Sequence, residues 1–151
     1  MKNLLTIEQS AELIKRGVSA DKASKRVTRQ VADSRGREIE KLRLKRWKDC
    51  VPYEKATMAN LRVGLMHFEH KEIFTLADLF ALLPKKLYGE ETDYCDCELH
   101  IHANKLGWSA SYTEFRGSEI MMMKFTSYGV ELIDALFSLL CKLLDNHVKL
   151  D

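Results

Sequence analysis

The spacing of apolar residues near the start of the chain predicts an amphipathic helix over residues 6–16. Thr6 is a good N-cap and Gln9 follows three residues later, which is the pattern of a capping box. Gly17 is a natural C-terminal stop. The apolar stripe consists of Ile7, Ala11 and Ile14, with Leu13 alongside.

The next segment, residues 22–48, holds eleven Lys and Arg against three acidic residues. Ser19 is a suitable cap for a second helix over residues 20–31, which we therefore expect. The stretch SAELIKRGVSADKASKRV has the order of a helix-turn-helix, whose second helix lies in the major groove of DNA. The match is loose, because Leu13 stands where the motif has a small residue and Arg26 where it has an apolar one. Nucleic-acid binding is thus one hypothesis and a solvated basic face the other. The candidate residues are Lys22, Lys25, Arg26, Arg29, Arg43, Lys45 and Arg46.

The pattern in residues 57–69 fits two structures. An alternation typical of a strand is formed by Leu61, Val63 and Leu65, whereas Met58, Leu61, Leu65 and Phe68 fit one helix face. Of the two, we expect a helix.

From Ile73 onward the pattern is clearer. The sequence FTLADLFALLPKKL predicts a short helix capped by Thr75 and ended by Pro84. The alternating pattern predicts a hairpin of two strands, residues 95–103 and 108–115, and then a third strand, residues 119–125. After it, Ser127 caps a helix that ends near Asn146. The predicted fold class is α+β, a three-stranded antiparallel sheet packed by helices with an N-terminal helical segment. We expect three segments in one compact unit. Residues 1–50 hold the N-terminal helices and the basic segment, and residues 73–151 form the α+β core. Residues 51–72 connect these two segments.

Composition indicates a globular chain. Of 151 residues, 46% are hydrophobic, 30% are charged and 2 are proline, which is typical of a folded protein with a real core. The net charge of +2 does not by itself indicate a polyanionic partner.

No apolar leader follows Met1, and the most apolar stretch, Val130 to Leu144, carries three charged residues and is shorter than the roughly 20 residues of a membrane span. We expect a cytoplasmic protein with free thiols and no membrane association.

The segment YCDCELHIHANKLGW concentrates potential metal ligands. In a strand, side chains alternate between faces, so Cys95 and Cys97 share a face with Leu99 and Ile101, while Asp96, Glu98, His100 and His102 share the other. The apolar face of this strand lines up with the apolar positions of the returning strand, residues 108–115, if Ala103 pairs with Trp108. This register separates the cysteines from the histidines, so a metal site at His100 and His102 needs a third ligand from elsewhere, and a solvated sheet face is the alternative.

No catalytic pattern is visible. There is no nucleophile elbow and no glycine-rich phosphate loop, so we expect neither an enzyme nor a cofactor. The stretch IMMMKF, residues 120–125, predicts a strand with both faces partly covered rather than a soft-metal site, because methionine fills irregular gaps in cores.

The segments FTLADLFALLPKKL, GWSASY and ELIDALFSLLCKLLDN, in this order, together with LTIEQSAELIKRGVSADKAS, resemble a family of short uncharacterised proteins of phages and mobile elements of gut bacteria. The resemblance covers residues 4–24 and 73–147, and it rests on hydrophobic scaffold positions. It implies no activity and no site residues. Residues 25–72 depart from the family by being longer and more basic.

The absence of a catalytic pattern and the compact sheet-and-helix unit favour a protein–protein interaction module with an unknown protein partner. Nucleic-acid binding through residues 22–48 is the alternative hypothesis, and homo-oligomerisation stays open.

Overall fold

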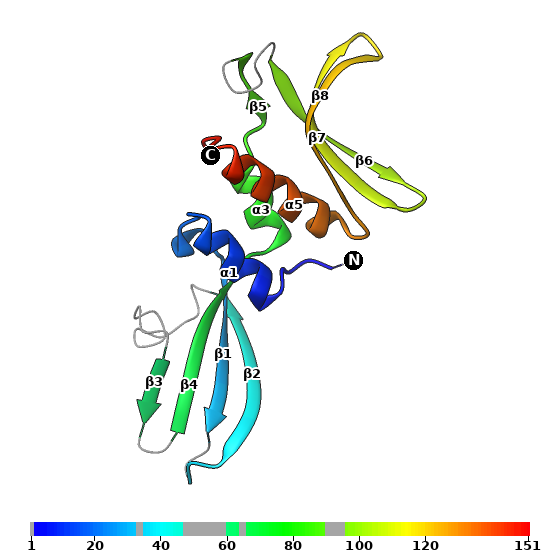
Figure 1. Cartoon of the computed structure of the whole chain (residues 1–151). Helices are drawn as coiled ribbons and strands as arrows, with labels where there is room; N and C mark the ends of the chain where they lie inside the picture. Colours follow the sequence, from blue (N-terminus) through cyan, green and yellow to red (C-terminus); the bar gives the residue numbers. More distant parts are fainter. Residues whose placement is uncertain (1, 33–34, 47–59, 64–65, 90–95) are drawn as a thin grey trace. The chain divides into compact units, whose positions relative to one another are not determined.

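The computed structural model describes residues 2–32, 35–46, 60–63, 66–89 and 96–151. It has an α+β fold with two antiparallel sheets, each of four strands in the described part of the chain (Figure 1). The chain divides into two compact units, Thr6–Thr75 and Met1–Leu5 with Leu76–Asp151. We call them the inserted unit and the C-terminal unit.

The predicted first helix is confirmed as α1, Ile7–Lys15. The Thr6 hydroxyl accepts from the Gln9 amide at 3.0 Å, and the Gln9 side chain accepts from the Thr6 amide at 3.0 Å. The helix ends at Gly17, whose positive φ of 109° allows the Val18 amide to donate to the Leu13 carbonyl at 3.0 Å. Both ends of α1 are thus set by the residues that the sequence indicated.

The buried face of α1 differs from the predicted stripe. Ser10 and Leu13 are fully buried, whereas Ala11 is exposed. The Ser10 hydroxyl accepts a hydrogen bond from the Phe74 amide at 3.2 Å, which satisfies a polar group inside the unit. A serine that bonds a distant backbone amide leaves no mark in the hydrophobic pattern, so the sequence could not indicate it.

The predicted second helix over residues 20–31 is wrong. Only Ala20–Lys22 form a helical turn, the 3-10 helix η1, and the chain then enters strand β1, Lys25–Ala32. This strand pairs on one side with β2, Glu38–Arg46, and on the other with β4, Met66–Ile73. The β-branched Val27, Thr28 and Val31 favour a strand, and its hydrogen bonds come from β2, the next strand in the chain, and from the distant β4.

The predicted helix over residues 57–69 is also wrong wherever the structure describes it. Strand β3, Asn60–Val63, pairs with β4 to complete the order β2-β1-β4-β3. Residues 57–59 and 64–65 lie outside the described residues. The stretch that we expected to connect two parts of the chain therefore contributes strands to a sheet.

The C-terminal unit contains the predicted strands and one more. Its helices are α3, Leu76–Leu82, and α5, Leu132–Asp145, and its sheet has the order β5-β6-β7-β8. The predicted three-stranded sheet corresponds to β6, β7 and β8, so the strand count was wrong. The extra strand β5 has only two residues, too few to show an alternating pattern, and pairs with Glu98 and Cys97. The bounds are Lys86–Leu87 for β5, Cys97–Asn104 for β6, Gly107–Arg116 for β7 and Glu119–Gly129 for β8.

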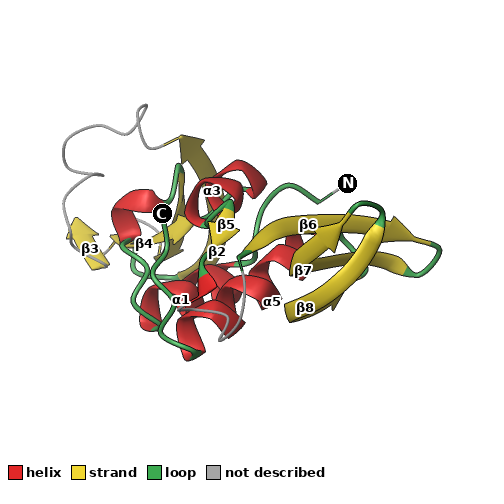
Figure 2. Cartoon of the chain, turned by 90° about the horizontal axis from the view of Figure 1, so that it is seen from above, coloured by secondary structure: helices red, strands yellow, loops and turns green. Residues whose placement is uncertain are grey.

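Helix α5 forms the core of this unit. It begins at Leu132 and not at the predicted Ser127, because residues 127–129 continue strand β8. Figure 2 shows α5 next to the sheet, where it contacts β7 and β8. The predicted polar positions Glu131, Asp134, Ser138, Lys142 and Asp145 all keep contact with solvent. The buried positions are Leu132, Ile133, Ala135, Leu136, Leu139, Leu140 and Leu143.

The first residues of the chain belong to the C-terminal unit. The Leu76 amide donates to the Asn3 carbonyl at 2.9 Å, and the Lys2 ammonium lies 2.9 Å from an Asp134 carboxylate oxygen. The chain therefore leaves this unit after Leu5 and re-enters it at Leu76, next to where it left. Residues 6–75 form an insertion between these two points.

No helix in the described parts of the chain combines the length and the apolar character that crossing a membrane requires.

Replacing Leu136 by alanine should destabilise the protein by about 2–5 kcal/mol, because the side chain is fully buried and its loss leaves a cavity. The matched change Ser138→Ala, on the half-buried side of the same helix, should alter the free energy of unfolding by less than about 0.5 kcal/mol. Urea unfolding followed by circular dichroism measures both. Equal effects of the two changes would contradict the orientation of α5.

Candidate functional site

The β6–β7 hairpin has the predicted register. Ala103 pairs with Trp108, Ile101 with Ala110, Leu99 with Tyr112, and His102 with Ser109. The turn is shorter than expected, because Asn104 and Gly107 also pair and only residues 105–106 lie between the strands. The Asn104 side chain closes the turn by accepting from the amides of Leu106 and Gly107 at 2.8 and 3.0 Å.

This register separates the cysteine from the histidines. Cys97, Ala110 and Tyr112 are fully buried, and the Tyr112 hydroxyl donates to the Pro84 carbonyl after α3 at 2.7 Å. Leu99, Ile101 and Trp108, on the same face, are half-buried. Of the opposite row, Asp96, Glu98 and His102 are exposed as predicted and His100 is half-buried. Cys95 lies outside the described residues.

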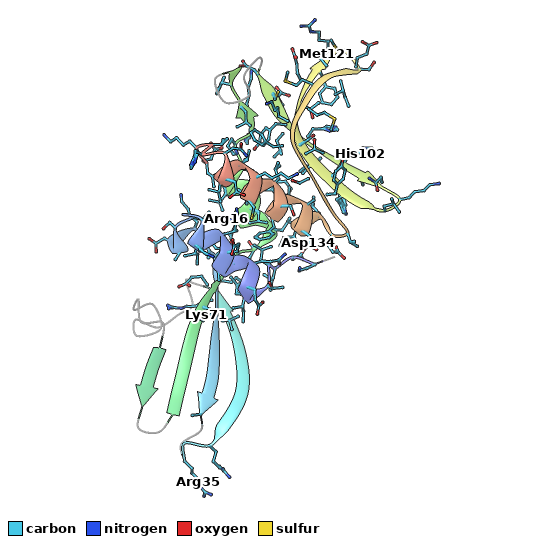
Figure 3. The ribbon with its side chains drawn as sticks, viewed as in Figure 1. Arg16, Arg35, Lys71, His102, Met121 and Asp134 are labelled. Atoms are coloured by element: carbon cyan, nitrogen blue, oxygen red, sulfur yellow. The ribbon has the colours of Figure 1, made fainter. Side chains whose placement is uncertain are left out.

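His100 and His102 provide a weak basis for a metal site. Their rings are nearly parallel, with centroids 6.4 Å apart, on strand β6, where Figure 3 labels His102. Among the residues that the structure describes, no three His, Cys, Asp or Glu side chains come together in a way that would hold an ion. The third ligand that this hypothesis requires is not found in the described part of the chain.

His100 instead takes part in an apolar contact. Its ring meets the ring of Phe115 edge-on, with centroids 5.0 Å apart. Because His100 pairs with Ser111 and Phe115 follows Thr113 on the same face, the two rings lie over these small residues. Ser111 and Thr113 are accordingly buried, and their hydroxyl oxygens lie 2.8 Å apart. Part of the face opposite α5 is therefore packed.

The same face ends in exposed apolar side chains, which we call the apolar patch: Phe115, Ile120, Met121 and Met123. Their fractional exposures run from 41% to 51%. Pairing brings Phe115 opposite Ile120 and Met123 opposite Thr113, and Met121 is the extra residue of a bulge in β8. Figure 3 places Met121 near the tip of the β7–β8 hairpin. Residues 120–125 were expected to form a strand with both faces partly covered, and Ile120, Met121 and Met123 are about half-covered.

The candidate nucleic-acid-binding residues fall on η1 and two neighbouring strands. Lys22 is exposed in η1, and the others lie on β1 and β2. Lys25 pairs with Arg46, Arg26 with Lys45 and Thr28 with Arg43. A recognition helix is therefore excluded here, because its expected residues form a strand. The sheet nevertheless brings together cations that are up to 21 positions apart in sequence.

Arg26 has a structural role. It is 3% exposed, and one of its guanidinium nitrogens lies 3.9 Å from a Glu72 carboxylate oxygen. A buried guanidinium beside a carboxylate is not accessible to a phosphate, so Arg26 is not a suitable ligand-binding residue.

Two arginines that the sequence-based candidates omitted are better placed. Arg35 and Arg37 are exposed in the connection between β1 and β2, where Figure 3 labels Arg35. They flank Gly36, whose φ of 76° marks a turn. Both lie where the chain passes from β1 to β2, at the end of a hairpin, so their side chains reach solvent.

Comparisons of the chain with protein-family models, with curated proteins and with solved structures found no match.

The burial of Cys97 can be tested by its reactivity. In a variant with Cys50, Cys95 and Cys141 replaced by serine, Cys97 should react with a thiol reagent at least about tenfold more slowly in the native state than in denaturant, because a buried thiol is shielded from the reagent. A variant that retains only the half-buried Cys141 serves as comparison. Equally fast labelling of Cys97 under both conditions would show that the two faces of β6 are reversed.

Proposed function

We propose that the protein is a non-enzymatic binding protein that docks onto another protein through the apolar patch. The observation that carries this proposal is the exposure of Phe115, Ile120, Met121 and Met123 at one end of the C-terminal sheet. Contiguous apolar side chains of this kind on a folded protein mark interaction sites, because leaving them in water forfeits the free energy of their burial.

The composition of the apolar patch supports a protein partner. Methionine side chains are flexible and polarisable, so they adapt to the surface of a partner, and an aromatic ring adds a rigid anchor. The patch also has a polar border, where an Arg116 guanidinium nitrogen lies 3.8 Å from a Glu114 carboxylate oxygen. An apolar centre with a charged rim is typical of protein interfaces.

We further propose that the protein comes from a phage or mobile element and acts in the cytoplasm. The resemblance of residues 4–24 and 73–147 to proteins of that origin supports the first point. The cysteine pattern, which lacks the spacing of a secreted disulfide framework, supports the second.

A photoreactive amino acid at position 121 should form a covalent adduct with a distinct protein in extracts of the native cells. The matched control is position 106, because Leu106 is 89% exposed but lies in the β6–β7 turn, away from the patch. Adding Ile120→Lys and Met123→Lys should lower the adduct yield at position 121 at least about tenfold, since burying each apolar side chain against the partner is worth roughly 1.5–3 kcal/mol. Equal adduct formation at 106 and 121, or none at 121, would contradict the proposal.

The arrangement of β1 and β2 favours nucleic-acid binding as a second function. Lys25 of β1 lies opposite Arg46 of β2. Like charges in directly opposed positions destabilise a sheet, and a bound polyanion removes that penalty. The exposed Arg35 and Arg37 extend the same positive region.

This second function predicts oligonucleotide binding that weakens as salt rises, because each phosphate that the protein neutralises releases counterions. The double change Arg43→Gln and Lys45→Gln should lower the affinity and reduce the slope of log K against log salt by about 0.7–0.9 for each phosphate that is no longer neutralised. Fluorescence anisotropy measures both quantities. The control change Lys105→Gln and Lys149→Gln removes the same charge from exposed positions of the other unit and should have little effect. Absence of binding at low salt rules this function out.

A further inference from the structure

Strand β8 forms one edge of the C-terminal sheet. In the described part of the chain it pairs with β7 alone, so the backbone groups along its outer side can pair with a further strand. The β7–β8 turn at Gly117 bounds this edge at one end. At the other end Phe125 has a positive φ of 54°, and the Lys142 ammonium donates to the Thr126 carbonyl. Residues 119–124, with the sequence EIMMMK, lie between these two limits.

The bulge at Met121 sorts residues 119–124 onto the two faces of the sheet. In a regular strand, Ile120 and Met123 would point to opposite faces, because three positions separate them. With the bulge, both lie on the face of Phe115 and the apolar patch, opposite alternate residues of β7. The residues on the other face of the sheet are Glu119, Met122 and Lys124.

This arrangement makes residues 119–124 complementary to themselves. When two copies lie antiparallel about a two-fold axis through the bulge, Glu119 is opposite Lys124 of the other copy. Ile120 is opposite Met123 of the other copy in the same register, and the axis repeats both pairs. Directly opposed residues then share a face, as an antiparallel sheet requires. An acid therefore meets a base, and an apolar side chain meets an apolar one, at every one of these pairs.

We infer that two copies of this chain pair through residues 119–124 of β8, each shielding part of the apolar patch of the other. This inference rests on the proposed role of the patch in binding and adds that a second copy occupies it until the partner protein displaces that copy. Opposed unlike charges stabilise the antiparallel register, whereas a parallel one would place Glu119 opposite Glu119. An ammonium has three donors, so Lys124 can bind this acid and keep its contacts within its own chain.

A bulge and a lysine also protect an edge strand from aggregation. That role does not account for an acid and a base placed symmetrically about four apolar residues. It also does not account for the exposure of Ile120 and Met123, which protection would disfavour.

Exchanging the two charges tests the pairing. Sedimentation equilibrium of the purified full chain at an ionic strength of about 0.15 M gives the dissociation constant of the dimer. Glu119→Lys alone should raise this constant at least about tenfold, because the two-fold axis places two like-charged pairs in the interface. Adding Lys124→Glu should restore it to within about threefold. Within one chain the two positions are roughly 15 Å apart along the strand, beyond the Debye length of about 8 Å, so restoration requires contact between copies.

A cysteine at position 121 tests where the axis lies. Both copies of this position are next to the axis, so Met121→Cys should form a disulfide between copies with diamide as oxidant, in the variant without Cys50, Cys95 and Cys141. Tyr128→Cys in the same background is the matched control, because Tyr128 is 69% exposed on the same strand but far from the axis. Cross-linking at position 121 should be at least about tenfold faster than at position 128.

Circular dichroism confirms that each variant is folded. A monomer at concentrations up to about 1 mM, no restoration by the double change, or equal cross-linking at positions 121 and 128 overturns the self-pairing inference. Each of these results is obtained with the purified chain alone and leaves the proposed docking function standing. That function is decided separately, by the adduct of position 121 in cell extracts.

Discussion

The burial of α5 is the interaction on which the C-terminal unit depends. Seven of its side chains are buried, and segments from both ends of the chain attach near it. Lys2 bridges to Asp134 in its first turn, and the Asp151 amide donates to the Leu82 carbonyl at 3.1 Å. Strand β8 passes into the helix through Gly129, where a β-carbon would lie 2.5 Å from the Ala135 nitrogen. Only glycine permits so close an approach, so the path from sheet to helix is fixed by one residue without a side chain.

The elements that the sequence predicted well are those with a strong one-sided pattern. For the β6–β7 hairpin, a slip by one residue would bring ionisable groups into the core, so a single register was acceptable and was confirmed. The first helix was predicted from its caps for a similar reason, since Thr6, Gln9 and Gly17 act on neighbours in sequence. The helix over residues 20–31 failed because β1 is stabilised by pairing with β4, far along the chain. The helix over residues 57–69 failed because a helical pattern and an alternating one were both visible there.

The candidate sites were predictable to different degrees. The density of Lys and Arg in residues 22–48 was evident, but their arrangement required the pairing of β1 with β2 and β4. Arg26 could not be recognised as buried without Glu72, which is 46 positions away and close only in the fold. The apolar patch was missed for the opposite reason. Alternation identifies a strand, but it does not show which of its apolar residues lack a covering element, as at Ile120 and Met123.

The position of the inserted unit has a consequence for the order of events during synthesis. Residues 6–75 are contiguous, so everything that their sheet requires has left the ribosome before α5 is made. Residues 2–5, although synthesised before these residues, find their backbone partner only at Leu76 and their ionic partner only at Asp134. At typical translation rates of roughly 5–20 residues per second, the synthesis of Lys2 and that of Asp134 are on the order of ten seconds apart. Residues 2–5 are thus fixed later than the insertion that follows them, and the C-terminal unit closes only after α5 has been made.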